Sequence, residues 1–195
     1  IESKFPQADV RIFRHAHFLD DDSPDSAQIW ADVTVSFLGF PPDTVFTSEN
    51  YGPPYAAHMG SKHIMFDQAR KKTPISATKI RNNPYKHWDM INEDVRAYYA
   101  KRIVVLGAES TGTTTLTKDL ASHYQTAYVP EYGRFYYEGR QPSTNQDWNT
   151  DEFVHIAKQQ NQMEDYLAKK ANKLLICDTD SFTTSVWHQR YVGKK

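Results

Sequence analysis

The 195-residue sequence has little cysteine, no long apolar run and no concentrated charge of either sign. Its single cysteine, Cys177, excludes an intramolecular disulfide, which suits a reducing compartment, so we expect a cytoplasmic protein. No apolar run approaches the roughly 20 residues that a membrane-spanning helix needs. The formal net charge is −1 and no basic block is present, so nothing indicates a nucleic-acid partner.

The composition nevertheless predicts a folded protein. Apolar residues make up 39% of the chain and aromatic residues 13%, which is enough to build a core. The length fits one ordinary domain or two small ones. The chain begins at Ile1 rather than at methionine, so we expect a processed or truncated start, with no signal peptide in view.

Residues 101–195 alternate apolar runs with amphipathic segments. This pattern predicts an α/β fold with a parallel sheet. The expected strands are 103–106, 126–129 and 174–177, and the expected helices are 113–123 and 151–170, with Thr150 as the N-cap.

Residues 1–100 are less regular, and we expect a domain junction near residue 100. Apolar spacing indicates strands at 8–13, 44–47 and 63–66 and helices at 27–40 and 91–98. A short helix is expected to begin near Ser76 and to end before Pro84.

Residues 107–115, GAESTGTTT, follow the phosphate-binding pattern G-x-x-x-x-G-K-[ST] at every position but one. Glycines allow the backbone to turn its N–H groups toward phosphate oxygens, and the following helix adds its positive end. The alternative is an ordinary glycine turn between a strand and a helix. We predict ATP binding by Gly107, Glu109, Ser110, Thr111, Gly112, Thr113, Thr114 and Thr115, with Thr114 also a ligand of Mg²⁺.

The departure from the pattern is Thr113, which stands where a lysine is expected. The loop therefore lacks the charge that reaches the β- and γ-phosphates. Another cation must supply part of that charge, and the candidates are Arg134 and an arginine on a later lid.

Two acids follow the third expected strand of this half. Asp178 and Asp180 stand where acids beside a phosphate loop commonly hold Mg²⁺. The alternative for either acid is a turn or a helix N-cap. We expect one of the two to take the capping role and Asp178 to serve the metal.

The loop after the second expected strand of this half carries Glu131, Tyr132 and Arg134. In a kinase for a small nucleoside, a carboxylate here can accept the proton of the attacking hydroxyl, and a tyrosine can stack on the base. A solvated loop with a surface ion pair is the alternative. Further on, His155, Gln159 and Gln160 are expected to lie on a solvated helix face.

A second anion site is conceivable around residues 75–81. Ser76, Thr78 and Arg81 offer two hydroxyls and a guanidinium where a helix begins. Serine is also a common helix cap, so the pattern alone leaves both readings open.

Together these segments resemble the bifunctional nicotinamide-nucleotide adenylyltransferase/ribosylnicotinamide kinase family, NadR. The resemblance spans nearly the whole chain. The segments that carry it, in the family's order, are VFTSENYG at 45–52, ISATKIRNNP at 75–84, GAESTGTTTL at 107–116, VPEYGR at 129–134 and CDTDSFTT at 177–184.

The resemblance implies two activities that use ATP and Mg²⁺. A Rossmann-like nucleotidyltransferase domain, of which residues 1–100 are the C-terminal part, joins nicotinamide mononucleotide to ATP to give NAD. Its ATP-phosphate motif matches Ser76, Thr78 and Arg81. A P-loop kinase domain, of which residues 101–195 are the N-terminal part, phosphorylates ribosylnicotinamide. There Asp178 would serve Mg²⁺, and Glu131, Tyr132 and Arg134 would face the nucleoside.

The sequence also departs from the family. The histidine-containing H-x-G-H turn that binds ATP does not occur before Ser76, and the family's kinase domain continues beyond a third strand. We therefore expect an internal piece of a longer enzyme, itself inactive in adenylyl transfer and impaired as a kinase. The alternatives are a P-loop kinase for another small substrate and an ATP- or NAD-sensing module without turnover. A homo-oligomer is possible.

Overall fold

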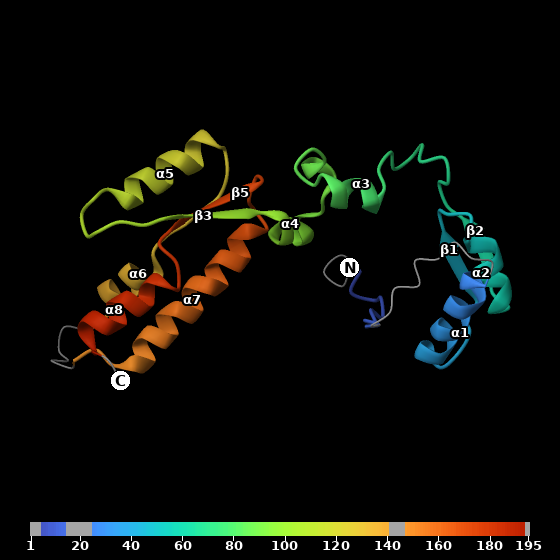
Figure 1. Cartoon of the computed structure of the whole chain (residues 1–195), viewed down its shortest axis with the longest axis horizontal. Coiled ribbons are helices and arrows are strands. Elements are labelled where there is room, and N and C mark those ends of the chain that lie inside the picture. The colour runs from blue at the N-terminus through green and yellow to red at the C-terminus, as the bar shows by residue number, and fades with distance from the viewer. Residues whose placement is uncertain (1–4, 15–24, 141–146, 194–195) are drawn as a thin grey trace. The chain divides into compact units, whose positions relative to one another are not determined.

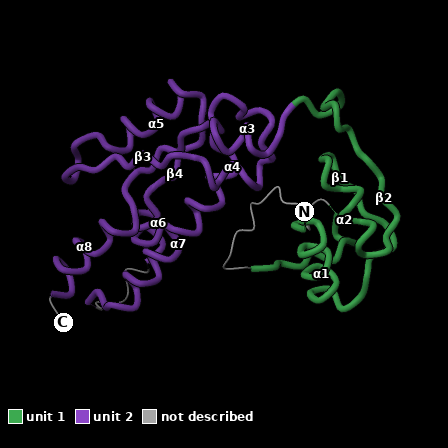
Figure 2. The backbone as a smooth tube through the Cα atoms, turned by 45° about the vertical axis from the view of Figure 1, so that its right-hand side comes forward, with its two compact units in different colours: residues 1–74 green, residues 75–195 purple. Residues whose placement is uncertain are grey.

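The computed structural model describes residues 5–14, 25–140 and 147–193 of the chain. It divides the chain into two compact units, Ile1–Pro74 and Ile75–Lys195 (Figure 2). Each unit is described by itself.

The first unit is a small parallel α/β arrangement. Its two-stranded sheet pairs Thr44 with Lys62 and continues in parallel register. Helices α1 and α2 pack against each other, and α2 packs on both strands. The elements are α1 (Ser26–Leu38), β1 (Thr44–Thr47), α2 (Gly52–His58) and β2 (Lys62–Met65).

The expectations for this unit were correct for its strands at 44–47 and 62–65 and for the first helix. The strand expected at 8–13 is wrong. The backbone there pairs with none of the described strands, and Arg11 instead donates a hydrogen bond to the Leu38 carbonyl at 3.2 Å. Helix α2 was missed because it begins with Gly-Pro-Pro, and prolines fit the first positions of a helix as well as a turn.

The second unit is a three-layer α/β structure (Figure 1). Its parallel sheet has the order β3-β5-β4, so the strand that comes last in the chain lies in the centre. Helix α5 covers one face and α7 the other, with α6 and α8 packed on α7. The elements are α3 (Ala77–Asn82), η1 (Trp88–Met90), α4 (Glu93–Tyr99), β3 (Lys101–Val105), α5 (Thr113–His123), β4 (Tyr128–Val129), α6 (Tyr132–Gly139), α7 (Thr150–Ala168), β5 (Leu174–Asp178) and α8 (Thr183–Tyr191).

The core of this unit follows from the alternation of side chains along β5. Leu175 and Cys177 point to the α7 face, where they pack with Val129, and Ile176 points to the α5 face, where it packs with Val105. All three β5 side chains are fully buried. Burial raises the pKa of the Cys177 thiol to about 12, so this cysteine is an inert core residue.

The boundary between the two compact units falls after Pro74. The sequence had predicted a junction near residue 100. Residues 75–100 pack within the second unit because α4 lies against α7, and Ala97 and Ala100 contact its core. The hydroxyl of Tyr85 also donates to the Tyr99 carbonyl at 2.9 Å. The assignment of 1–100 and 101–195 to two catalytic domains stays a prediction.

Helix α7 begins one residue earlier than the sequence suggested. Asn149 is its N-cap: the side chain accepts from the Glu152 N–H at 3.1 Å, and Glu152 accepts from the Asn149 N–H at 3.0 Å. This capping box satisfies two N–H groups that the helix itself leaves unpaired.

We expect Asn149→Ala to lower the free energy of unfolding by about 1 kcal/mol, the usual cost of losing an N-cap. Urea denaturation followed by circular dichroism measures the change. Thr150→Ala is the control, since the side chain of Thr150 contacts His188 at an exposed position and does not cap the helix. Equal losses in the two variants would contradict the capping assignment.

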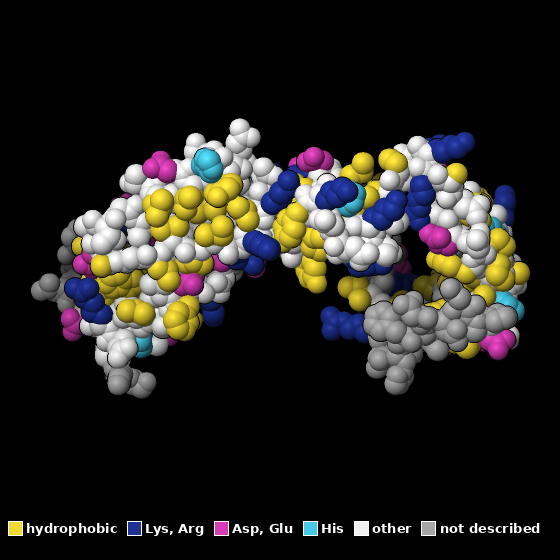
Figure 3. Space-filling model, turned by 45° about the horizontal axis from the view of Figure 1, so that its top comes forward, with side chains coloured by type: hydrophobic (Ala, Val, Ile, Leu, Met, Phe, Trp, Pro, Cys, Tyr) yellow, Lys and Arg dark blue, Asp and Glu magenta, His cyan; other side chains and the backbone are white. Residues whose placement is uncertain are grey.

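Hydrophobic side chains gather over the part of the second unit formed by β3 and α5 (Figure 3). Ile103, Leu106 and Leu116 in this region are 38%, 58% and 51% exposed. Among the described strands, β3 pairs only with β5, so its other edge carries unpaired backbone groups.

Within the described residues, no helix combines the length and the apolar character that a membrane span demands.

Candidate active site

The phosphate loop joins β3 to α5, which confirms the predicted order of strand, loop and helix. Gly112 has a φ of +89° and is the N-cap residue of α5, a backbone conformation that glycine adopts without strain. At Gly107, an added Cβ would lie 2.6 Å from Thr111 Oγ1 and 2.8 Å from Thr113 Cγ2. Both glycines are therefore required by the shape of the loop.

The carboxyl end of β5 places Asp178 against the start of α5. Thr114 Oγ1 donates a 2.5 Å hydrogen bond to Asp178 Oδ2, and Asp178 is only 4% exposed. These two oxygen atoms lie in contact at the start of a helix, and oxygen atoms are the ligands that Mg²⁺ prefers.

The metal would not be enclosed by protein ligands. Among the described residues, no group of three or more His, Cys, Asp or Glu side chains is placed to hold an ion. A site of one hydroxyl and one carboxylate suits Mg²⁺, which usually keeps waters and takes further ligands from substrate phosphates. The residues present fit the ion in that mode.

Asp180 has a different role from Asp178. Its Oδ1 accepts hydrogen bonds from the N–H and the hydroxyl of Thr183, both at 2.7 Å. Asp180 therefore stabilises the start of α8, which leaves Asp178 as the acid turned toward the loop.

Glu131 follows β4, next to β5 in the sheet, so it lies at the same carboxyl edge as Asp178. Burial raises the pKa of the half-buried Glu131 carboxyl, Arg134 lowers it, and the negative charge of Asp178 raises it. Arg134 Nε lies 3.6 Å from Glu131 Oε2. A carboxylate with a raised pKa beside a phosphate site has the properties of a general base.

The start of α6 is held by α7. Gln160 is 2% exposed, and its Oε1 accepts from the Tyr132 N–H at 2.9 Å. The expected solvated face is therefore wrong for Gln160, which is buried because α6, a helix absent from the sequence prediction, covers it. The Tyr132 hydroxyl lies 3.2 Å from His155 Nε2.

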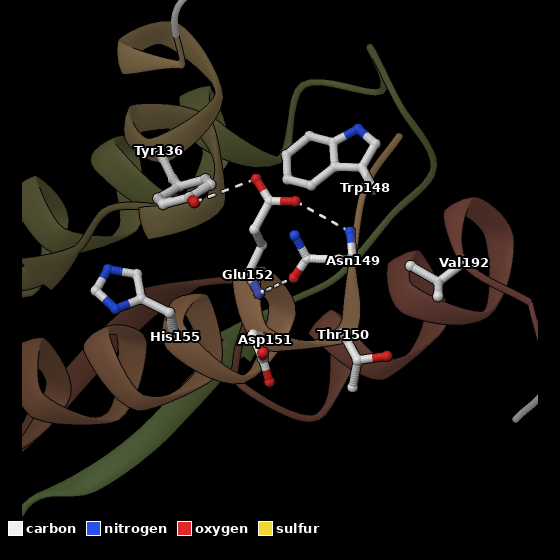
Figure 4. Close-up of a pocket in the computed structure, with 8 residues that line it drawn as sticks. All are labelled: Tyr136, Trp148, Asn149, Thr150, Asp151, Glu152, His155 and Val192. Atoms are coloured by element: carbon white, nitrogen blue, oxygen red, sulfur yellow. Dashed lines mark hydrogen bonds between the residues drawn. The ribbon is translucent and has the colours of Figure 1, made fainter. Parts of the chain in front are cut away.

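A pocket of about 600 Å³ adjoins these residues (Figure 4). Glu152 holds one wall together by accepting hydrogen bonds from the Tyr136 hydroxyl at 3.2 Å and from Arg140 Nε at 3.0 Å. The lining residues are Tyr136, Trp148, Asn149, Thr150, Asp151, Glu152, His155 and Val192. Sequence reasoning missed this pocket because residues 148–152 and His155 enclose it only together with Tyr136 of α6 and Val192, which follows α8 and is distant in the sequence.

The second expected anion site is only partly assembled. Ser76 is the N-cap of α3, and its Oγ accepts from the Lys79 N–H at 3.2 Å. Arg81 Nη2 donates to Thr78 Oγ1 at 3.3 Å, so these two side chains are together. The assignment of the three residues to ATP stays a prediction.

The fold of residues 75–195, with its glycine loop between strand and helix and an acid on the neighbouring strand, defines a P-loop kinase-like α/β protein. A family model described as an AAA domain matches residues 102–195.

Over almost its whole length the chain is similar to NadR proteins. It is 30% identical over 193 residues to the trifunctional NAD biosynthesis/regulator protein NadR of Escherichia coli K12, and 29% identical to the protein of the same name from Salmonella typhimurium LT2. Each match covers 97% of this chain and 47% of the relative, so the chain spans about half the length of these relatives.

Two solved structures of NadR proteins also match this chain. A NadR protein in complex with NR matches with a TM-score of 0.65 and 25% identity over 88% of this chain and 51% of that one. A NadR protein in complex with NAD and AMP-PNP matches with a TM-score of 0.62 and 26% identity over 87% of this chain and 51% of that one.

Proposed function

We propose that the second unit binds ATP with Mg²⁺ and transfers its γ-phosphoryl group to ribosylnicotinamide, giving nicotinamide mononucleotide and ADP in NAD salvage. The observation that carries the proposal is the shared edge of the sheet. There the phosphate loop, the Thr114–Asp178 pair and Glu131 stand at the ends of three neighbouring strands. The similarity to NadR proteins solved with NR and with AMP-PNP supports the same choice of ligands.

In this reaction the loop at 107–115 holds the triphosphate through its N–H groups and the start of α5. When Mg²⁺ is bound, it neutralises charge on the phosphates, and Thr114 and Asp178 are the residues that would hold it. Glu131 accepts the proton of the attacking ribose hydroxyl, since a carboxylate of raised pKa binds that proton more strongly than an ordinary one.

The nucleoside is proposed to lie along the start of α6. Tyr132 offers an aromatic face there, and Arg134 offers hydrogen-bond donors for the ribose. The nicotinamide ring of ribosylnicotinamide is flat and positively charged, and aromatic faces attract such cations. The nearby pocket supports this choice, because Tyr136 and Trp148 line it together with the carboxyl groups of Asp151 and Glu152.

We propose adenylyl transfer from ATP to nicotinamide mononucleotide as the second activity, with NAD as product. Residues 1–100 would then belong to the Rossmann-like adenylyltransferase domain, with Ser76, Thr78 and Arg81 on the ATP phosphates. The Thr78–Arg81 contact supports it, as do relatives named for NAD biosynthesis. In the full-length enzyme, Arg81→Ala should abolish NAD formation and leave phosphorylation of ribosylnicotinamide unchanged.

The charge around Glu131 predicts how the rate depends on pH. Because Arg134 lowers the pKa of Glu131, removing that cation raises the pKa further. Arg134→Leu should therefore move the acid limb of the kcat profile to higher pH, since the base must lose its proton before it can act. An unmoved limb, measured from pH 4 to 9, would show that Glu131 is not the base.

A substrate comparison tests the proposed function against its alternatives. ATP and Mg²⁺ are supplied with ribosylnicotinamide, adenosine, uridine or no acceptor, and the phosphorylated products are separated by chromatography. We expect transfer to ribosylnicotinamide above all others. Preferred transfer to another nucleoside would indicate a kinase of different specificity, and ATP binding without transfer to any acceptor would indicate a sensing module.

A further inference from the structure

The phosphate loop lacks the lysine that such loops carry, and Thr113 stands in its place. A threonine side chain is neutral and short, so it cannot bring a positive charge to the β- and γ-phosphates. Phosphoryl transfer places negative charge on exactly those oxygens, and it is cations that stabilise this charge. The protein therefore needs a cation from outside the usual position. The inference below rests on the proposed function.

The described structure brings one arginine into contact with the loop. Arg190, in the last turn of α8, has its Nη1 3.4 Å from Oε1 of Glu109, a residue within the loop. Helix α8 follows the carboxyl end of β5, so it starts from the edge of the sheet that carries Asp178. A guanidinium is thus placed at the loop from a different element of the fold.

The guanidinium is also supported by aromatic rings of its own helix. Its Cζ lies 5.6 Å from the ring centre of Trp187 and 5.7 Å from that of Tyr191. Contacts of this kind hold an arginine side chain near one orientation. The five N–H donors of a guanidinium suit phosphate oxygens in pairs.

The present partner of Arg190 does not compete strongly with a nucleotide. Both side chains of the Arg190–Glu109 pair are 58% exposed, and exposed ion pairs are weak because water screens them. A triphosphate carries several negative charges and offers bidentate contacts. An incoming ATP can therefore take over the guanidinium, while Glu109 keeps it at the loop until then.

Arg134, the cation named from the sequence, is less suited to this task. Its Nε lies 3.6 Å from Glu131, the proposed base, on α6. There it lowers the pKa of the base and faces the proposed nucleoside site. It therefore does not supply the positive charge that the phosphate loop lacks.

We propose that Arg190 replaces the missing loop lysine and binds the β- and γ-phosphates of ATP. The charge of a P-loop lysine has in this protein moved from the start of α5 to the end of α8. Arg190 and Thr113 then form a functionally coupled pair: a lysine at 113 makes Arg190 dispensable.

A double-mutant cycle tests the coupling. In the protein as it stands, Arg190→Met should lower kcat/KM for ATP by about 100-fold, the scale of losing one charged contact to a transition state. In a Thr113→Lys background the same change should cost less than about threefold, because the new lysine supplies the charge. An equal loss in both backgrounds would overturn the proposal.

Two further variants separate phosphate binding from a surface ion pair. Glu109→Gln frees Arg190 and removes a negative charge near the phosphates, so it should raise the affinity for AMP-PNP while Arg190→Met lowers it. If the ion pair alone matters, both variants will lower it alike and the proposal fails. Gln189→Met, on an exposed neighbour in α8, is the matched control and should leave the rate unchanged.

Binding measurements keep this inference apart from the proposed function. Calorimetric titration with AMP-PNP and with AMP needs no acceptor, and Arg190→Met should weaken only AMP-PNP binding, since AMP has no β- or γ-phosphate. If ribosylnicotinamide is not phosphorylated but this selective loss is found, the function is wrong and Arg190 is still a phosphate ligand. If ribosylnicotinamide is phosphorylated and AMP-PNP binding is unaffected, the inference on Arg190 is wrong.

Discussion

Replacing Asp178 with asparagine is expected to lower kcat for phosphoryl transfer by about 100- to 1,000-fold, the range for removing one charge-stabilising group from an active site. Asp178 is 4% exposed and accepts a hydrogen bond from Thr114 at 2.5 Å. Asparagine keeps the size of the side chain and an acceptor oxygen for Thr114, so the fold should survive. What disappears is the negative charge that would hold Mg²⁺.

Steady-state kinetics across a range of Mg²⁺ concentrations measures this effect. The Mg²⁺ concentration for half-maximal rate should rise in Asp178→Asn, which a purely structural defect would not produce. Asp180→Asn is the matched control, because asparagine caps helices as well as aspartate does. Similar losses in both variants would contradict the assignment of Asp178 to the metal and of Asp180 to the cap.

Replacing Glu131 with glutamine is expected to lower kcat by about 100- to 10,000-fold, the range for losing a positioned general base. Glutamine preserves the shape of the side chain but cannot accept the proton of the ribose hydroxyl. The KM for ribosylnicotinamide should change little, because the lost interaction belongs to the transition state. The acid limb of the pH profile should also disappear, since the group that titrates there is gone.

An unchanged kcat in Glu131→Gln would leave Glu131 as the ion-pair partner of Arg134 and nothing more. The ion pair at 3.6 Å also predicts the companion result. Arg134→Leu keeps the base and shifts its limb to higher pH, whereas Glu131→Gln removes the limb altogether. The two profiles together distinguish a base tuned by an arginine from a solvated loop.

The elements that the sequence predicted well are those with local signals. Helix α5 spans Thr113–His123 as expected, because Gly112 and the apolar spacing after it are contained in the segment itself. The predicted bounds of strand β5 differ from the observed ones by one residue. A run of apolar residues flanked by polar ones can be recognised from the segment itself. The phosphate loop was found for the same reason, as its pattern is contiguous.

What the sequence could not provide depends on contacts between distant segments. Helix α6 contains two glycines and several tyrosines, which form helices poorly. It is stabilised by packing on α7 and by the hydrogen bond from the Tyr132 N–H to Gln160. The burial of Gln160 follows from that packing. The compact boundary after Pro74 likewise reflects the docking of α4 on α7, which no spacing along the chain reveals.

The candidate site shows the same division. The sequence named Asp178 and Glu131 because each follows an expected strand, but only the order β3-β5-β4 shows that they lie at the same edge of the sheet. The contact of Arg190 with Glu109 joins residues 81 positions apart and had no signal in the sequence.

The most direct test of the account is transfer of radiolabelled phosphate from [γ-³²P]ATP to ribosylnicotinamide by the protein and by its Asp178→Asn variant. We predict labelled nicotinamide mononucleotide with the unmodified protein and a loss of at least about 100-fold with the variant. Label appearing only as inorganic phosphate, or equal transfer by both proteins, would contradict the account.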